Sequence, residues 1–129
     1  MTAQYAYPSQ PETFKDRLAD LVSFEGRIGR QSYWLRGLAL AGVNVVAAIL
    51  FALAGEGGAA GFVFALIGIA IYAFSTFAGL ATTVKRLHDR GRSGWFMLIA
   101  FIPFVGLWLL IEVGFLAGSQ TPNEYGDPI

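Results

Sequence analysis

The residues best suited to chemistry are gathered in one short segment, Lys85–Trp95, which reads KRLHDRGRSGW. It contains the only histidine of the chain, His88, next to the acid Asp89. A histidine beside an acid is typical of acid–base chemistry, because histidine titrates near neutral pH. Arginine side chains are typical of anion recognition, since a guanidinium group binds phosphate through paired hydrogen bonds. The arginines of this segment and of residues 26–34, directly before the first apolar block, are Arg27, Arg30, Arg86, Arg90 and Arg92.

The arginines favour a site for anionic lipid head groups or for a membrane partner, on the predicted cytoplasmic side. Basic pockets on the cytoplasmic side of membrane proteins bind such head groups. In this hypothesis Arg86, Arg90 and Arg92 contact the phosphate, and Arg27 and Arg30 complete the pocket. His88 and Asp89 then orient the arginines through hydrogen bonds.

A catalytic reading is less well supported by the residues. Neighbouring positions on a helix point about 100° apart, so Asp89 is badly placed to orient His88. The nucleophile would have to be Ser93 or Ser32, and neither lies in a recognisable nucleophile elbow. The chain has no cysteine and one histidine, which argues against a zinc site. We therefore predict no catalytic residues, no metal and no cofactor, and a non-enzymatic function.

The same segment also has a purely structural interpretation. Lys85 and Arg86 suit the negative end of a helix, and Gly91 suits the left-handed turn that follows it. Ser93 is placed to cap the next helix, and Trp95 to anchor it at the membrane interface. This interpretation leaves His88 and Asp89 unexplained, so both interpretations stay open.

Three apolar blocks must position these residues. The 129 residues are 55% hydrophobic and 14% charged, which is too apolar for a soluble domain of this size. The sequence predicts an all-α polytopic membrane protein. Its formal net charge of zero gives no indication of nucleic-acid binding. Pro103 should kink the last of the three predicted transmembrane helices. The predicted spans cover residues 35–54, 62–84 and 95–116.

The segment before the first span has a different character. Phe14, Leu18 and Leu21 recur at helical spacing among charged residues, which predicts an amphipathic helix at the membrane surface. A helix packed on a soluble partner is the alternative. The expected organisation is a flexible tail, a surface helix and a three-span membrane domain, over residues 1–11, 12–25 and 26–129.

All nine basic residues fall on one side of this three-span arrangement. They precede or open the first span, or lie between the second and third spans. The connection 55–61 and the tail 117–129 contain no lysine or arginine. Because basic residues near span ends are retained in the cytoplasm, we predict a bacterial inner-membrane protein with a cytoplasmic N-terminus and an external C-terminus.

Polar residues inside the predicted spans suggest an alternative function, and small residues in the second span suggest a contact between helices. Asn44 and Glu112 would suit a small oligomeric transporter or channel, because polar groups within a membrane often line a path for ions. Glu112 has no evident partner at its depth and lies near the outer end of its span. Small residues at four-residue intervals permit close helix packing, within one chain or in a homo-oligomer. These residues are Ser75, Gly79 and Thr83.

Four segments resemble a known family. The run 86–89 followed by 91–95 is similar to the signature of domain of unknown function 805, a family of small bacterial inner-membrane proteins. Residues 26–34, the Ile102-Pro103 pair with Gly106, and the run 123–126 with Pro128 resemble further family motifs. The family often has Ser or Thr where Gly29 stands, so the first span has a weaker N-cap here. The resemblance implies a polytopic membrane protein and no particular reaction.

Overall fold

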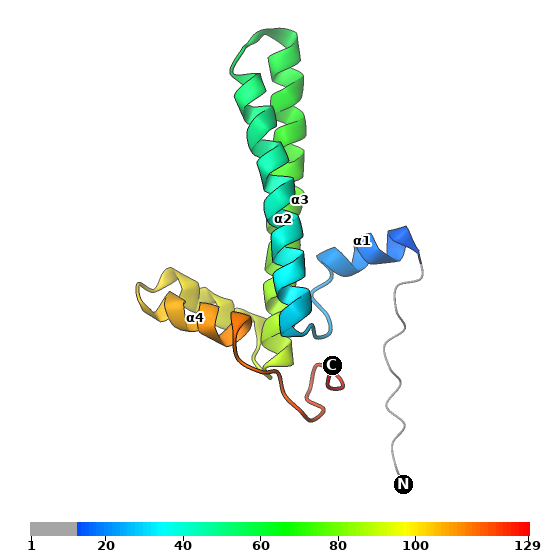
Figure 1. Ribbon diagram of the computed structural model, residues 1–129, viewed down its shortest axis with the longest axis vertical. Helices are drawn as coiled ribbons and strands as arrows, with labels where there is room; N and C mark the ends of the chain where they lie inside the picture. Colours follow the sequence, from blue (N-terminus) through cyan, green and yellow to red (C-terminus); the bar gives the residue numbers. More distant parts are fainter. Residues whose placement is uncertain (1–12) are drawn as a thin grey trace.

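The computed structural model describes residues 13–129, and every named element in that range is a helix. The all-α prediction is therefore confirmed for this range, and the predicted tail over 1–11 lies outside it. Five elements follow one another along the chain (Figure 1). They are α1 (Phe14–Val22), α2 (Arg30–Ala54), α3 (Gly58–Asp89), the 3-10 helix η1 (Gly94–Phe101) and α4 (Val105–Gly114).

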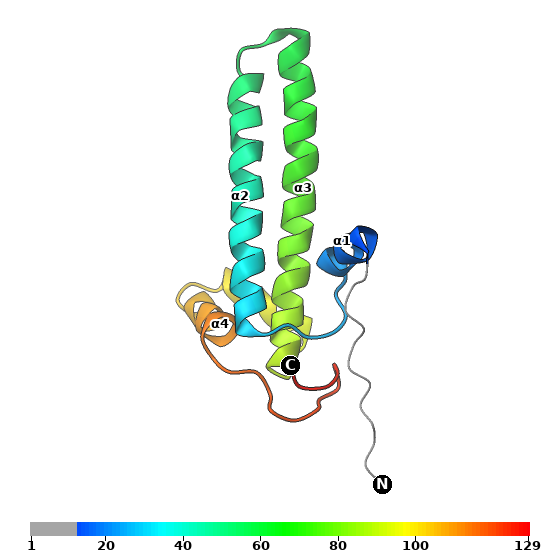
Figure 2. The same cartoon turned by 45° about the vertical axis from the view of Figure 1, so that its right-hand side comes forward.

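The two long helices, α2 and α3, form an antiparallel hairpin (Figure 2). Gly57 and Gly58 both have a positive φ, 79° and 72°, which lets the chain reverse within a few residues. With 25 and 32 residues, α2 and α3 are about 38 Å and 48 Å long, enough to cross a hydrocarbon core of about 30 Å. Only 6% and 17% of the residues in their most apolar stretches are buried, unlike those of a soluble core helix.

The helix α1 begins with a capping box between Thr13 and Asp16 and ends at Val22. It lies within the segment 12–25 for which a helix was predicted, and none of its residues is buried. It extends sideways from the end of the hairpin where Arg30 and Asp89 lie, which we call the base (Figure 1). That this helix rests on a membrane surface stays a prediction.

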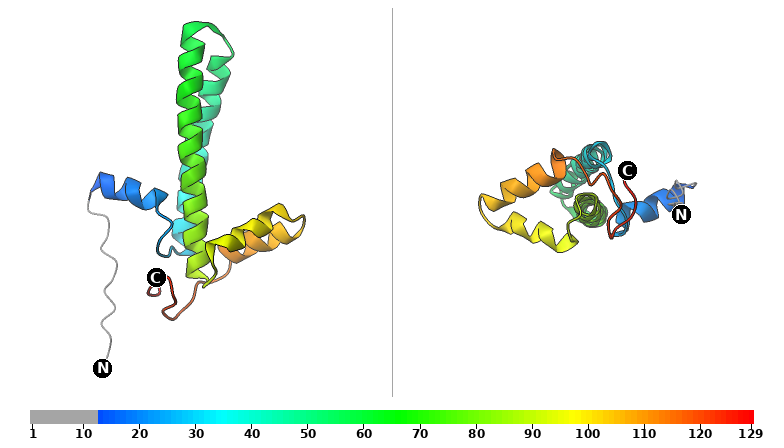
Figure 3. Two further views of the ribbon diagram at one scale, coloured as in Figure 1. Left: turned by 180° about the vertical axis from the view of Figure 1, so that it is seen from behind. Right: turned by 90° about the horizontal axis from the view of Figure 1, so that it is seen from below.

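The prediction of one long helix over 95–116 was wrong. The chain reverses between η1 and α4, and these two short helices project together to one side of the base (Figure 3). Phe104 takes a left-handed φ of 66° directly after Pro103, which cannot donate a backbone hydrogen bond. A kink was expected from Pro103, but the left-handed residue beside it turns the kink into a reversal. At about 16 Å and 15 Å, neither helix can cross a membrane alone.

The C-terminal segment, residues 115–129, returns to the base and packs there (Figures 1 and 2). It contacts Arg27, which precedes α2, through the carbonyl groups of Thr121 and Gly126. These contacts place the C-terminal segment and Arg27 at the same end of the hairpin, because the third apolar block does not cross to the other end. The side of a membrane on which each terminus lies stays a prediction.

Candidate functional site

Asp89, the last residue of α3, is the centre of the charged groups at the base. Its Oδ1 accepts hydrogen bonds from Nε of Arg27 at 3.0 Å and from Nη2 of Arg27 at 2.8 Å. Its Oδ2 accepts from Nη1 of Arg86 at 2.5 Å. The three side chains are 6%, 1% and 0% exposed, respectively. Asp89 is thus a buried carboxylate that pairs with two buried arginines, and buried charges are tolerated when they are paired in this way.

Arg27 also holds the C-terminal segment. Its remaining N–H groups donate to the carbonyl oxygens of Ser119 at 2.7 Å, Thr121 at 3.3 Å and Gly126 at 3.1 Å. Gly118 lies so close to Asp89 that a Cβ atom there would be 2.0 Å from Oδ2. One arginine therefore connects the start of α2, the end of α3 and the last turns of the chain.

Five consecutive carbonyl groups at the end of α4, residues 113–117, accept hydrogen bonds from side chains. Arg86 donates to Val113 at 2.7 Å and to Leu116. Trp34 donates to Gly114 at 2.8 Å, Arg30 to Phe115 at 3.0 Å, and Arg90 to Ala117. The last carbonyls of a helix have no intrahelical partner, and the negative end of the helix favours cations. Arginines that looked available for ligands are thus partly used to cap α4.

Glu112 lies at this base and not near the far end of a span, which corrects its predicted position. Its side chain is fully buried, and Oε1 accepts from Nε of Arg90 at 3.1 Å and from Nε of Arg92 at 3.2 Å. The expectation that it lacks a partner was wrong, because the reversal at Phe104 carries α4 back to the arginines. Asn44 lies instead along the α2–α3 hairpin, so the structure does not bring these two residues into one path.

A second ion-pair group attaches α1 to the hairpin. Asp20 accepts hydrogen bonds from Nζ of Lys85 at 2.8 Å and from Nη2 of Arg36 at 2.5 Å. Burial of Asp20 raises the pKa of its carboxyl group, but the hydrogen bonds from Lys85 and Arg36 outweigh burial and bring the pKa below its ordinary value of 3.8. The carboxylate thus stays ionised and holds both cations at neutral pH.

His88 and Asp89 do not form a catalytic pair in the structure. His88 Nδ1 lies 3.0 Å from the carbonyl oxygen of Gly26, which fixes Nδ1 as the donor and leaves Nε2 as an acceptor. Its ring stacks flat on Tyr125 with centroids 3.8 Å apart. The carboxylate of Asp89 does not contact His88 and pairs instead with Arg27 and Arg86. Ser93 accepts from the backbone N–H of Trp95 and caps η1, as the sequence predicted for a cap at this position.

Sequence reasoning missed several members of the site. Asp20 and Arg36 were given no partner, and Lys85 was assigned only to the end of a helix. Tyr125 was noted within a motif but was given no role. A signal for Tyr125 existed, because an aromatic in a polar, turn-rich tail needs a surface to pack on. Nothing in the order of the residues indicates that the tail returns to His88.

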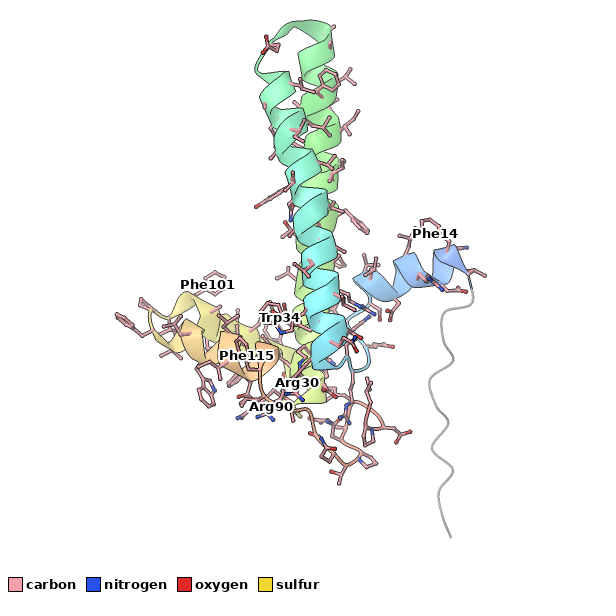
Figure 4. All side chains as sticks on the ribbon, in the orientation of Figure 1. Phe14, Arg30, Trp34, Arg90, Phe101 and Phe115 are labelled. Carbon is pink, nitrogen blue, oxygen red and sulfur yellow. The ribbon has the colours of Figure 1, made fainter. Side chains whose placement is uncertain are left out.

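The ten charged residues of the two groups form what we call the base cluster. Figure 4 shows Arg30 and Arg90 at the junction of α2 with α4, with Trp34 and Phe115 beside them. A polar cavity of about 430 Å³ opens between the start of α2 and residues 117–120. The cluster contains seven cations and three carboxylates: Arg27, Arg30, Arg36, Lys85, Arg86, Arg90, Arg92, Asp20, Asp89 and Glu112.

Comparison with known proteins places the chain in a family. Residues 21–127 match the family model described as "Protein of unknown function (DUF805)". The chain therefore belongs to this family, and the resemblance seen in the sequence is confirmed. No solved structure matches the chain significantly.

Three relatives come from Escherichia coli (strain K12). The uncharacterized protein YiiR is 36% identical, over 82% of this chain and 85% of the relative. The inner membrane protein YhaI is 35% identical, over 85% and 88%. The inner membrane protein YhaH is 32% identical, over 86% and 91%. With two helices long and apolar enough to cross a membrane, the structure is consistent with a small integral membrane protein.

Proposed function

We propose that this chain is a small inner-membrane protein that binds anionic lipid head groups at its base. In this proposal α2 and α3 cross the membrane as a two-helix hairpin, and the base lies at the cytoplasmic surface. The distribution of charge supports this orientation. Every cation of the base cluster is at one end of the hairpin, whereas the loop at the other end has Glu56 as its only charged residue. Cytoplasmic ends of membrane helices are enriched in lysine and arginine.

The structure narrows the choice of arginines that could contact a head group. Arg27 and Arg86 are buried, and their N–H groups are taken by Asp89 and by backbone carbonyls. Head-group contact therefore falls to Arg30, Arg90 and Arg92. Arg30 is exposed, and the side chains of Arg90 and Arg92 are 25% and 47% exposed.

One observation carries the proposal: in the base cluster cations outnumber carboxylates by seven to three, and Arg30, Arg90 and Arg92 reach its exposed side, while the two acids of the C-terminal segment, Glu124 and Asp127, stand outside this count. Such a surplus beside Trp34 and Phe115 is suited to the head-group layer, where aromatic rings are also favoured. Phe14 of α1 and Phe101 of η1 are 76% and 83% exposed, which suits side helices that lie along a membrane surface.

Native mass spectrometry of the full chain, released gently from membranes, tests the proposal. The test variant is Arg30→Gln with Arg92→Gln, which leaves Arg90 to hold Glu112 and Ala117. The matched control is Lys15→Gln with Arg17→Gln, which removes two exposed cations from α1 instead.

Each cation near an anionic surface contributes about 1 kcal/mol, so the test variant should retain anionic lipid roughly thirtyfold less well. The control should lose less of its lipid than the test variant, because Lys15 and Arg17 lie on α1, outside the base cluster. Equal retention of anionic lipid by both variants and the wild-type chain would reject the head-group site. It would leave the base cluster with a purely structural role.

A further inference from the structure

A groove of about 430 Å³ runs along the hairpin between α2 and α3, away from the base cluster. It begins beside Trp34 and extends to Asn44 on α2 and Ser75 on α3. Asn44 is ten residues beyond Trp34, or about 15 Å along the helix. In a hydrocarbon core of about 30 Å, that distance places Asn44 near the middle of the membrane.

Three polar side chains of the groove have no partner among the described residues. They are Asn44 through Oδ1, Ser75 through Oγ and Thr82 through Oγ1. Ser75 and Thr82 are only 3% and 2% exposed. Thr83, by contrast, donates its hydroxyl to the carbonyl of Gly79 at 3.0 Å, the usual way in which a helix satisfies a hydroxyl. An unpaired polar group is costly in hydrocarbon, where no water can replace the missing partner.

Small residues leave room for a helix to approach these groups. Gly37 and Ala41 line the α2 side of the groove, and Gly79 lines the α3 side. A Cβ atom at Gly37 would meet nothing within 4 Å, so the space beside this glycine is open. Small residues at a membrane helix surface allow backbones to come close and polar side chains to bond across the contact.

We propose that a second copy of this chain occupies the groove, and that the two copies form a parallel, two-fold symmetric dimer within the membrane. Copies that insert in the same direction bring Asn44 to the same depth in each. A carboxamide has both donors and acceptors, so two Asn44 side chains satisfy one another across the axis. Ser75 and Thr82 form the buried floor of the groove beneath this pair.

The depth of Asn44 favours a second copy over a lipid as the occupant. The polar groups of a phospholipid lie at the membrane surface, and its acyl chains offer no donor to Asn44 Oδ1 halfway across. A helix of a second copy carries polar groups at that depth. This proposal does not depend on head-group binding at the base.

The absence of cysteine from the chain makes a direct test possible, because a single introduced cysteine can form a disulfide only between copies. Ala41→Cys places a thiol in the groove. Ala39→Cys is the matched control: it makes the same substitution two positions away, at an exposed residue about 200° around the helix. After oxidation in native membranes, Ala41→Cys should form a disulfide-linked dimer and Ala39→Cys should not.

A second variant tests the role of Asn44 itself. Asn44→Leu in the cysteine-bearing chain should weaken the dimer by roughly tenfold, because two hydrogen bonds are lost at the axis. The fraction of dimer is followed by native mass spectrometry across protein concentration. Equal cross-linking at positions 39 and 41, or none at 41, would overturn the proposal. A monomer that retains a lipid in the wild-type chain and loses it in Asn44→Leu would identify the occupant as a lipid and also overturn it.

Discussion

Arg27 and Asp89, 62 positions apart in the sequence, form a two-point contact in which Nε and Nη2 of the arginine share one carboxylate oxygen. The contact joins the start of α2 to the end of α3. The remaining donors of Arg27 hold the C-terminal segment, and Arg86 on the other carboxylate oxygen holds the end of α4. Asp89 is therefore the point through which four parts of the base are connected.

Replacement of Asp89 should be strongly destabilising. In Asp89→Asn, Arg27 and Arg86 stay buried without a neutralising charge, and breaking a buried ion pair on one side costs about 3–5 kcal/mol. Thermal unfolding in detergent measures the loss. The control is Glu56→Gln in the exposed loop at the other end of the hairpin, which should change stability by less than about 0.5 kcal/mol. Equal effects of the two substitutions would contradict the central place of Asp89.

Gly118→Ala should destabilise the chain although it adds only one methyl group, at a half-buried position. The added Cβ would be 2.0 Å from Oδ2 of Asp89, a carboxylate that two arginines hold in place. Overpacking of this kind typically costs about 1–3 kcal/mol. Gly42→Ala is the control, because its Cβ meets nothing within 4 Å and alanine favours a helix. A neutral Gly118→Ala, measured in the same unfolding assay, would mean that the tail does not pack on Asp89.

The reversal between η1 and α4 predicts which of two substitutions at Phe104, a residue that is 86% exposed, gives the more stable chain. A left-handed φ is unfavourable for alanine and unstrained for glycine, so Phe104→Gly should be more stable than Phe104→Ala by about 1 kcal/mol. In a continuous helix the order is reversed, with alanine favoured by about 1 kcal/mol. Comparing the unfolding of the two variants therefore distinguishes a hairpin from a third span. Higher stability of the alanine variant would contradict the reversal and support a continuous helix over residues 95–116.

Attachment of α1 should depend on pH through Asp20. Its pKa is lowered in the folded chain, so its contribution to stability is complete above the ordinary pKa of 3.8 and is lost as the pH falls through the lower folded value. The protection of α1 amides against hydrogen exchange, relative to an unfolded chain at the same pH, should accordingly be high at neutral pH and should fall below about pH 4.

A substitution provides the matching test at neutral pH. Asp20→Asn removes the ionised acceptor from Lys85 and Arg36, so α1 should exchange quickly at pH 7. Glu25→Gln, at an exposed neighbouring acid, should leave the exchange of α1 unchanged. Slow exchange of α1 in Asp20→Asn would show that apolar packing alone holds this helix.

The two long helices could be predicted from the sequence because their apolar residues form uninterrupted runs. The predicted ranges 35–54 and 62–84 lie inside α2 and α3, and the helices continue beyond them into charged residues at the base. An apolar run ends at the first charged residues, whereas the helix continues through them because ion pairs satisfy Lys85, Arg86 and Asp89.

The rest of the fold, and most of the candidate site, depends on contacts between segments that are far apart in the sequence. Residues 95–116 are as apolar as a span, and the reversal rests on the backbone conformation of a single residue, Phe104. Once α4 turns back, Glu112 meets Arg90 and Arg92, and the tail reaches His88 through Tyr125. Neither the partner of an arginine nor the direction of a tail follows from local periodicity.

The measurement that tests the account most directly is the side of the membrane on which the C-terminus lies. A fluorescent reporter that folds only in the cytoplasm, fused after Ile129, is compared with a reporter that is active only outside the inner membrane. The two-helix hairpin predicts cytoplasmic fluorescence and no activity outside, because Arg27, at the base that we propose to be cytoplasmic, holds residues 119–126. Activity outside with no cytoplasmic fluorescence would contradict the hairpin and support a third membrane crossing.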